Sequence, residues 1–91
     1  MENTKLIRLL RTFSKDELRD FENFIRSPYF NNGTYLVKFF EEIKKFAPKF
    51  SGRQFTKETI FAKLQPSAKY KDAYMRKLIS NLTKLADEFL V

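Results

Sequence analysis

The sequence predicts an all-α fold, a compact bundle of five to six short helices that forms a single domain over residues 1–91. Apolar residues recur at three- and four-residue steps in five segments, which is the spacing of one helix face. The chain has only two Gly and three Pro, so a sheet with many hairpins is not expected. Eleven Phe and four Tyr supply a core, since each buried ring covers about 150–250 Å².

The first two helices are expected over residues 4–12 and 15–26. Ser14 lies between them, and Glu17 follows three residues later. This spacing is a capping box, in which the serine hydroxyl accepts from the Glu17 N–H and the carboxylate accepts from the serine N–H. Pro28 ends the second helix, because proline disfavours the helical conformation at the residue before it.

Three more helices are expected in the rest of the chain. The third covers 34–47, and a loop over 48–55 separates it from the fourth. Thr56 is placed to cap this fourth helix over 57–64. The fifth helix begins at Asp72 and has the clearest apolar stripe of all. Its members are Met75, Leu78, Ile79, Leu82, Leu85, Ala86 and Phe89.

The composition argues against enzymatic chemistry. The chain has no Cys and no His, which removes disulfides, thiolate metal sites and the commonest general base. The only glycines are Gly33 and Gly52, so there is no Gly-rich loop that cradles phosphate. Carboxylate pairs are adjacent in sequence and splay apart around a helix. We expect no catalytic residue, no cofactor, no metal and no small-molecule substrate.

No apolar run approaches the roughly 18 residues that a membrane-spanning helix needs. The first residues lack a secretory pattern, so a cytoplasmic location without a membrane partner is expected. The chain closes on Phe89-Leu90-Val91 without a polar tail. We therefore expect it to be the N-terminal domain of a longer protein.

The net charge of +7 is unevenly distributed. Residues 1–43 contain seven basic and seven acidic side chains, whereas residues 44–91 contain eleven basic and four acidic ones. Four of the acids fall within 15–26, at Asp16, Glu17, Asp20 and Glu22. The basic side chains of residues 44–91 either keep the helix surfaces solvated or attract an acidic partner.

Residues 9–21, LLRTFSKDELRDF, resemble the start of pyrin and death-effector domains in the death-fold superfamily. The shared pattern is a leucine-rich helix, a short turn, and a helix that opens with acids and continues Leu-x-x-Phe. The death fold has six helices, whereas five are evident here. The whole chain is also similar to the N-terminal region of uncharacterised multi-helical bacterial proteins with the turn found here at 27–31, SPYFN.

The death-fold resemblance implies a homotypic assembly domain, in which an acidic patch on one copy pairs with a basic patch on the next. The charge distribution suits such pairing. The acidic residues expected to take part are Asp16, Glu17 and Asp20, and the basic ones are Lys44, Lys45, Arg76 and Lys77. Tyr29 and Phe30 are candidates for an apolar anchor, with packing against the core as the alternative.

Binding of nucleic acid is the alternative function. The fourth and fifth helices would then form a helix-turn-helix unit, with base and phosphate contacts from Arg76, Lys77, Ser80, Asn81 and Lys84. Three features oppose it. The connection between these helices is longer than the usual 3–4 residues, and Asp72 at the start of the last helix repels phosphate. The last helix also has the longest and most regular apolar stripe, which indicates a structural role in the bundle.

Overall fold

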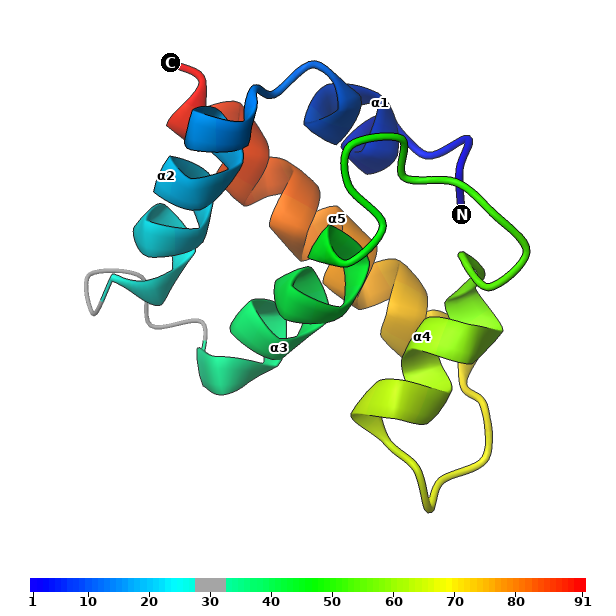
Figure 1. Ribbon diagram of the computed structural model, residues 1–91. Coiled ribbons are helices and arrows are strands. Elements are labelled where there is room, and N and C mark those ends of the chain that lie inside the picture. Colours follow the sequence, from blue (N-terminus) through cyan, green and yellow to red (C-terminus); the bar gives the residue numbers. More distant parts are fainter. Residues whose placement is uncertain (28–32) are drawn as a thin grey trace.

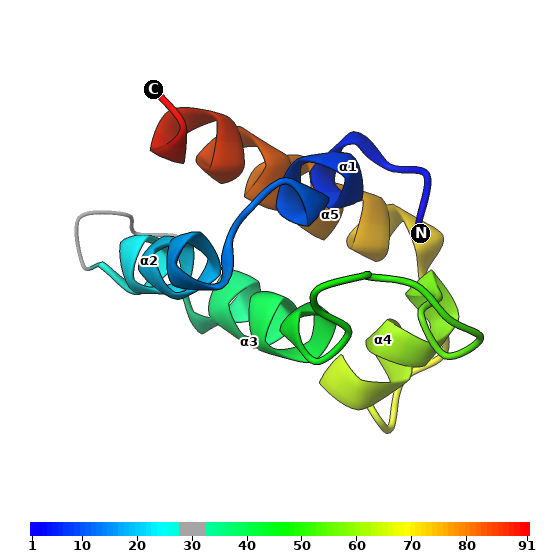
Figure 2. The ribbon, with the colours of Figure 1, turned by 45° about the horizontal axis from the view of Figure 1, so that its top comes forward.

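The computed structural model describes residues 1–27 and 33–91 and contains five α-helices and no strand within them. The helices are α1 (Lys5–Arg11), α2 (Lys15–Arg26), α3 (Gly33–Lys44), α4 (Lys57–Leu64) and α5 (Asp72–Phe89). In Figure 1, α5 runs diagonally through the bundle, and it contacts each of the other four helices. The turned view separates two packed pairs, α1 with α5 and α2 with α3 (Figure 2). The predicted all-α bundle is confirmed.

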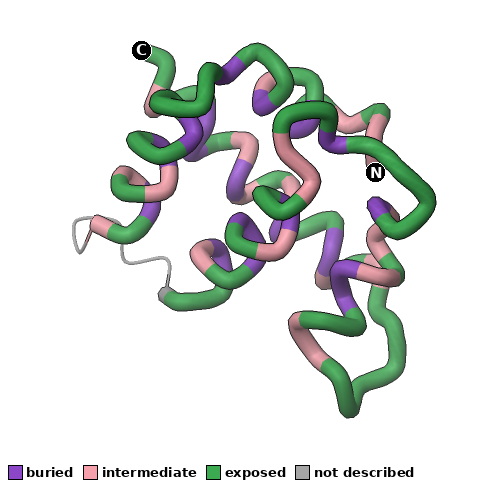
Figure 3. Tube along the Cα trace, in the orientation of Figure 1, coloured by how far each residue is buried: buried purple, intermediate pink, exposed green. Residues whose placement is uncertain are grey.

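The core is built almost entirely from hydrocarbon side chains, which lie where the helices face one another (Figure 3). No polar or charged side chain is buried in the part of the chain that the structure describes. Phe21 on α2 is fully buried, and its ring meets Phe13 at 5.7 Å, Phe40 of α3 at 5.3 Å and Phe89 of α5 at 5.3 Å between centroids. Edge-to-face and tilted rings at these distances add attraction beyond the area they bury.

Local capping fixes where two of the helices begin. The Glu17 N–H donates to Ser14 Oγ at 3.1 Å, and the Ser14 N–H donates to Glu17 Oε1 at 2.8 Å, which completes the predicted capping box. Thr56 Oγ1 accepts from the Thr59 N–H at 3.1 Å at the start of α4. Each such cap contributes about 1 kcal/mol to helix stability. The bounds predicted for α2 and α4 are confirmed.

The predicted third helix, 34–47, is three residues too long at its C-terminus, because α3 ends at Lys44. The next N–H groups bond three residues back: Phe46 to the Ile43 carbonyl and Ala47 to the Lys44 carbonyl, both at 3.0 Å. Pro48 disfavours helical geometry at Ala47, and the chain continues in turns.

The connection from α3 to α4 is part of the core. Phe50 and Phe55 are buried, and the Phe55 ring lies 4.8 Å from that of Phe46. The Arg11 guanidinium donates at 3.0 Å to the carbonyl oxygens of Lys49 and Phe50, which ties this connection to α1. The loop predicted over 48–55 thus supplies two core rings that helical periodicity did not reveal.

Candidate protein-interaction surface

Asp16, Glu17 and Asp20 on α2 are exposed, and contacts within their own helix partly neutralise them. Asp16 and Asp20 both flank Arg19, whose nitrogens lie 3.6 Å and 3.7 Å from their carboxylates. Glu17 uses one oxygen in the capping box. Each of these contacts uses a single carboxylate oxygen, so the second oxygen of all three carboxylates remains open to an outside cation. The predicted anchor residues Tyr29 and Phe30 lie outside the described residues.

Three of the four predicted basic residues, Lys44, Lys45 and Arg76, form ion pairs within the chain. Lys44, the last residue of α3, contacts the Glu22 carboxylate of α2, and Lys45 pairs with Glu42 at 3.1 Å. Partial burial alone would raise the pKa of Glu22, but hydrogen bonds from Lys44 and Arg26 outweigh it and hold the pKa below its usual range. Lys44 therefore lies beside the acidic helix α2 of the same chain.

We define the basic end as residues 57–77, which comprise α4, the connection to α5 and the first part of α5. This segment has six basic and two acidic side chains. Among the described residues, no carboxylate forms an ion pair with Lys63, Lys69, Lys71 or Lys77, and all four are exposed. These four lysines, of which only Lys77 was predicted, are the free cations of the basic end.

Asp72 joins the parts of the basic end together. Its Oδ1 atom accepts from Lys57 Nζ and from the Tyr70 hydroxyl, both at 2.8 Å, and its Oδ2 atom lies 2.8 Å from Arg76 Nε. The hydrogen bonds from Lys57 and Tyr70 hold the pKa of Asp72 below its usual range. Asp72 is the first residue of α5, as predicted. Lys71 occupies the N-cap position and its side chain does not cap the helix, so Asp72 acts at this helix start through its contacts with Lys57, Tyr70 and Arg76.

The Tyr70 hydroxyl provides a spectroscopic test of this arrangement. Desolvation, followed by the hydrogen bond to Asp72, raises the pKa of Tyr70 to about 12. Because this value exceeds the roughly 10 of an unfolded tyrosine, the stabilisation is complete below about pH 10 and is lost as the pH rises through 12. Ultraviolet titration should show a late-ionising tyrosine that Tyr70→Phe removes. In Asp72→Asn the late ionisation should move toward pH 10; an unchanged titration would contradict the contact.

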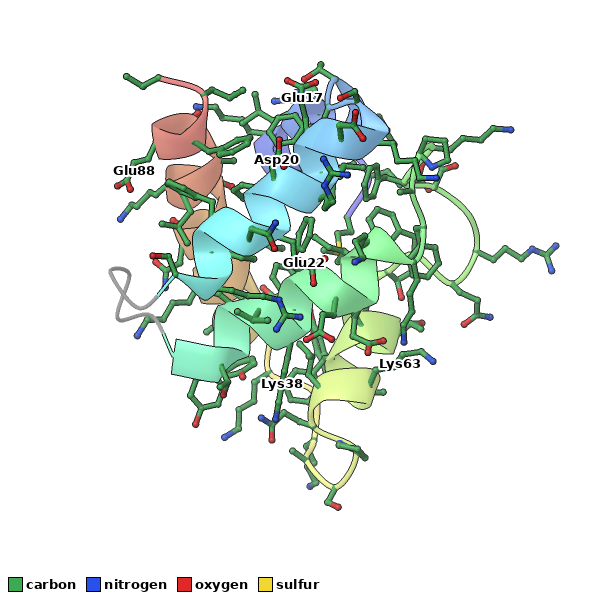
Figure 4. The ribbon with its side chains drawn as sticks, turned by 60° about the vertical axis from the view of Figure 1, so that its left-hand side comes forward. Glu17, Asp20, Glu22, Lys38, Lys63 and Glu88 are labelled. Atoms are coloured by element: carbon green, nitrogen blue, oxygen red, sulfur yellow. The ribbon has the colours of Figure 1, made fainter. Side chains whose placement is uncertain are left out.

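We define the acidic end as α2 together with residues 85–91. These segments have six acidic and three basic side chains. Asp87 pairs with Lys5 at 3.3 Å between exposed groups, and the last turn of α5 contains no basic residue. The helix dipole places partial negative charge at that terminus, so Asp87 and Glu88 add to it. Figure 4 shows Glu17, Asp20 and Glu88 toward one end of the molecule and Lys38 and Lys63 toward the other.

The length of α5 separates the two ends. This helix has 18 residues, about 27 Å at 1.5 Å per residue, and the longest dimension of the molecule is 35 Å. The Debye length at physiological salt is about 8 Å. The two ends therefore act as separate regions of opposite charge.

A small groove opens beside the basic end, between the start of α3 and the first half of α5. It has a volume of about 220 Å³ and is lined by Tyr35, Leu36, Tyr74, Lys77, Leu78 and Asn81. Pockets for drug-sized ligands run from about 300 Å³ upward, so this groove fits one or two side chains. Tyr35 is 60% exposed. In the sequence, the only indication of this groove is that Tyr35 is an aromatic residue outside the apolar stripe of its helix.

The residues predicted to contact nucleic acid divide over two hollows along α5. Arg76 and Ser80 line one that also includes Lys57 and the first residues of the chain. Lys77 and Asn81 line the tyrosine groove, and Lys84 is exposed farther along the helix.

No family model, no curated protein and no solved structure matches the chain. Within residues 1–27 and 33–91, no three His, Cys, Asp or Glu side chains are grouped so that they can hold a metal ion. No helix of that part of the chain is both long and apolar enough to cross a membrane.

Proposed function

We propose that this domain is a protein-interaction module that associates with copies of itself, the acidic end of one copy against the basic end of the next. The observation that carries the proposal is the separation of opposite net charges by the length of α5. The two ends are different surfaces, so their contact is head-to-tail and need not close into a ring. Such a contact permits growth into a filament.

The structure changes which cations we assign to this contact. Asp16, Glu17 and Asp20 remain the acidic partners, joined by Glu88 at the end of α5. Lys63, Lys69 and Lys71 replace Lys44 and Lys45, which are engaged by Glu22 and Glu42 within the chain. Lys77 stays in the set, whereas Arg76 is held by Asp72.

Charge pairs of this kind set orientation and association rate more than affinity. Each exposed pair contributes about 0–1 kcal/mol, so several must act together. The last turn of α5 favours their formation, because it contains two acids and no basic residue, and only Asp87 of these two pairs with a cation, Lys5 of α1. Cations from a second copy would relieve that excess of negative charge.

Light scattering on protein freed of nucleic acid tests the proposal. Mass should rise with concentration at an ionic strength of about 0.01 M, where the Debye length is roughly 30 Å, and fall at about 1 M, where it is roughly 3 Å. A constant monomer mass at every concentration and both salt levels would contradict self-association.

Nucleic-acid binding is supported by one observation, an exposed row of Arg76, Ser80 and Lys84 along α5. Asp87 and Glu88 continue the same row and would repel phosphate. Addition of duplex DNA to the same samples separates the two functions. A complex whose affinity falls steeply with salt would favour nucleic acid, whereas unchanged mass would favour assembly.

A further inference from the structure

The groove between the start of α3 and the first half of α5 has an apolar base and aromatic walls. Leu36 and Leu78 are almost fully buried at its base. Tyr35, which is 60% exposed, and Tyr74 line it as well, and the Tyr74 ring is held by an edge-to-face contact with Phe61 at 5.7 Å between centroids. Aromatic rings attract a further ring in offset or edge-to-face geometry. A space of about 220 Å³ between two tyrosines therefore favours a single aromatic guest.

The charged and amide groups that line the groove are a cation and a hydrogen-bond donor. Lys77 and Asn81 line it, whereas no described Asp or Glu does. Lys77 is exposed and forms no ion pair with a described carboxylate. The Asn81 side chain forms no hydrogen bond within the part of the chain that the structure describes, so its amide is available to a ligand.

A second free cation lies beside the groove on α3. Lys38 follows Tyr35 by three residues, which makes the two side chains neighbours on the helix surface. It is exposed and has no ion pair among the described residues. The acids that follow it on α3 pair with other cations, Glu41 with Arg26 and Glu42 with Lys45. Both helices that form the groove thus present a free lysine to an acidic ligand.

We propose that the groove binds an acidic segment of another protein, which inserts one phenylalanine between Tyr35 and Tyr74. Charge complementarity selects this occupant, because carboxylates on either side of the phenylalanine would face Lys38 and Lys77. Helix α2 of a second copy brings carboxylates but no such anchor, since its apolar side chains pack into its own core. The inference therefore goes beyond self-association. A central apolar anchor supplies the affinity, and the rim charges set the orientation.

NMR titration of the isotope-labelled chain with a capped peptide, Glu-Asp-Phe-Asp-Glu, tests the groove at concentrations where light scattering gives the monomer mass. Amide shifts should centre on the residues that line the groove. The same peptide with Ala in place of Phe should bind about tenfold more weakly or worse, because the anchor is lost. The peptide Lys-Lys-Phe-Lys-Lys should not bind, because its charges face the lysines of the groove.

Variants of the groove test the same contact from the other side. Tyr35→Ser should weaken binding of the phenylalanine peptide about tenfold, and Lys77→Gln about two- to fivefold, as for an exposed ion pair. Tyr35→Phe keeps the ring and should bind as the parent chain does. Lys84→Gln makes the same charge change farther along α5 and should also bind as the parent does. Thermal unfolding verifies the fold of each variant.

The outcomes separate this proposal from self-association. Equal binding of the phenylalanine and alanine peptides, or binding that Tyr35→Ser leaves unchanged, would overturn the groove as a receptor. Equal binding that also falls steeply with salt would identify a general surface for polyanions instead. Asp16→Lys with Asp20→Lys should keep the preference for phenylalanine over alanine, because α2 does not line the groove. Selective peptide binding by a chain that never associates would support the groove and overturn self-association alone.

Discussion

Replacement of Phe21 by alanine is expected to lower the free energy of unfolding by about 3–5 kcal/mol, the usual cost of removing a buried aromatic ring. The ring is fully buried, and its centroid lies 5.3–5.7 Å from those of Phe13, Phe40 and Phe89, which belong to three different parts of the chain. Its loss leaves a cavity where α2, α3 and α5 meet. No single neighbour can fill this space, because each is fixed by its own helix or turn.

Chemical and thermal denaturation followed by circular dichroism measure this loss. Domains of this size have a total stability of about 5–15 kcal/mol, and the midpoint should fall by roughly 15–30 °C. Phe21→Leu retains most of the apolar volume and should cost markedly less. Tyr35→Ala, at an exposed position, should change stability by no more than about 0.5 kcal/mol. A loss below about 1.5 kcal/mol for Phe21→Ala would show that the ring contacts are not the centre of the core.

Reversal of charge at one end is expected to abolish self-association, and reversal at both ends in separate copies should restore it. Asp16→Lys with Asp20→Lys converts the exposed face of α2 to positive charge and sets it against the basic end of the next copy. Lys63→Glu with Lys69→Glu reverses two of the four free lysines of the basic end and leaves that end with four basic and four acidic side chains, so its net positive charge is cancelled. Each double variant alone should remain monomeric, because the acidic-end variant sets like charges against each other and the basic-end variant removes the net attraction.

A one-to-one mixture of the two double variants should associate, since the new lysines of one variant then meet the new glutamates of the other. Lys49→Glu with Arg53→Glu is the matched control for the basic-end variant. It makes the same change in net charge at two exposed positions of the connection between α3 and α4, outside the residues that define the two ends, and should leave association intact. Loss of association in this control, or a mixture that stays monomeric, would refute pairing between the two ends.

The helices themselves could be predicted from the sequence because their determinants are local. Apolar spacing identified all five, and a capping residue fixed the start of α2 at Ser14 and of α4 at Thr56. The end of α3 was misplaced because the apolar pattern continues through Phe46 into turns that bond three residues back. Periodicity alone does not distinguish those turns from another helical turn.

The candidate site could be predicted only in part, because it depends on which helices pack together. The acidic residues were found because they cluster on one helix. The engagement of Lys44 by Glu22 requires that α3 pack beside α2, and the groove requires that Tyr35 of α3 lie against Tyr74 of α5. The burial of Phe50 and Phe55 could not be predicted for a related reason. Residues in a connection follow no period that indicates which of them are buried.

The central place of α5 has a consequence during synthesis on the ribosome. This helix is the last of the five, and the other four all pack against it. Until it emerges, the apolar faces of α1 to α4 have no partner at the middle of the bundle. At about 5–20 residues per second, the 18 residues of α5 take roughly one to four seconds to appear. During that interval the nascent chain displays phenylalanine-rich surface, so the order of synthesis creates a period in which chaperones have most to bind.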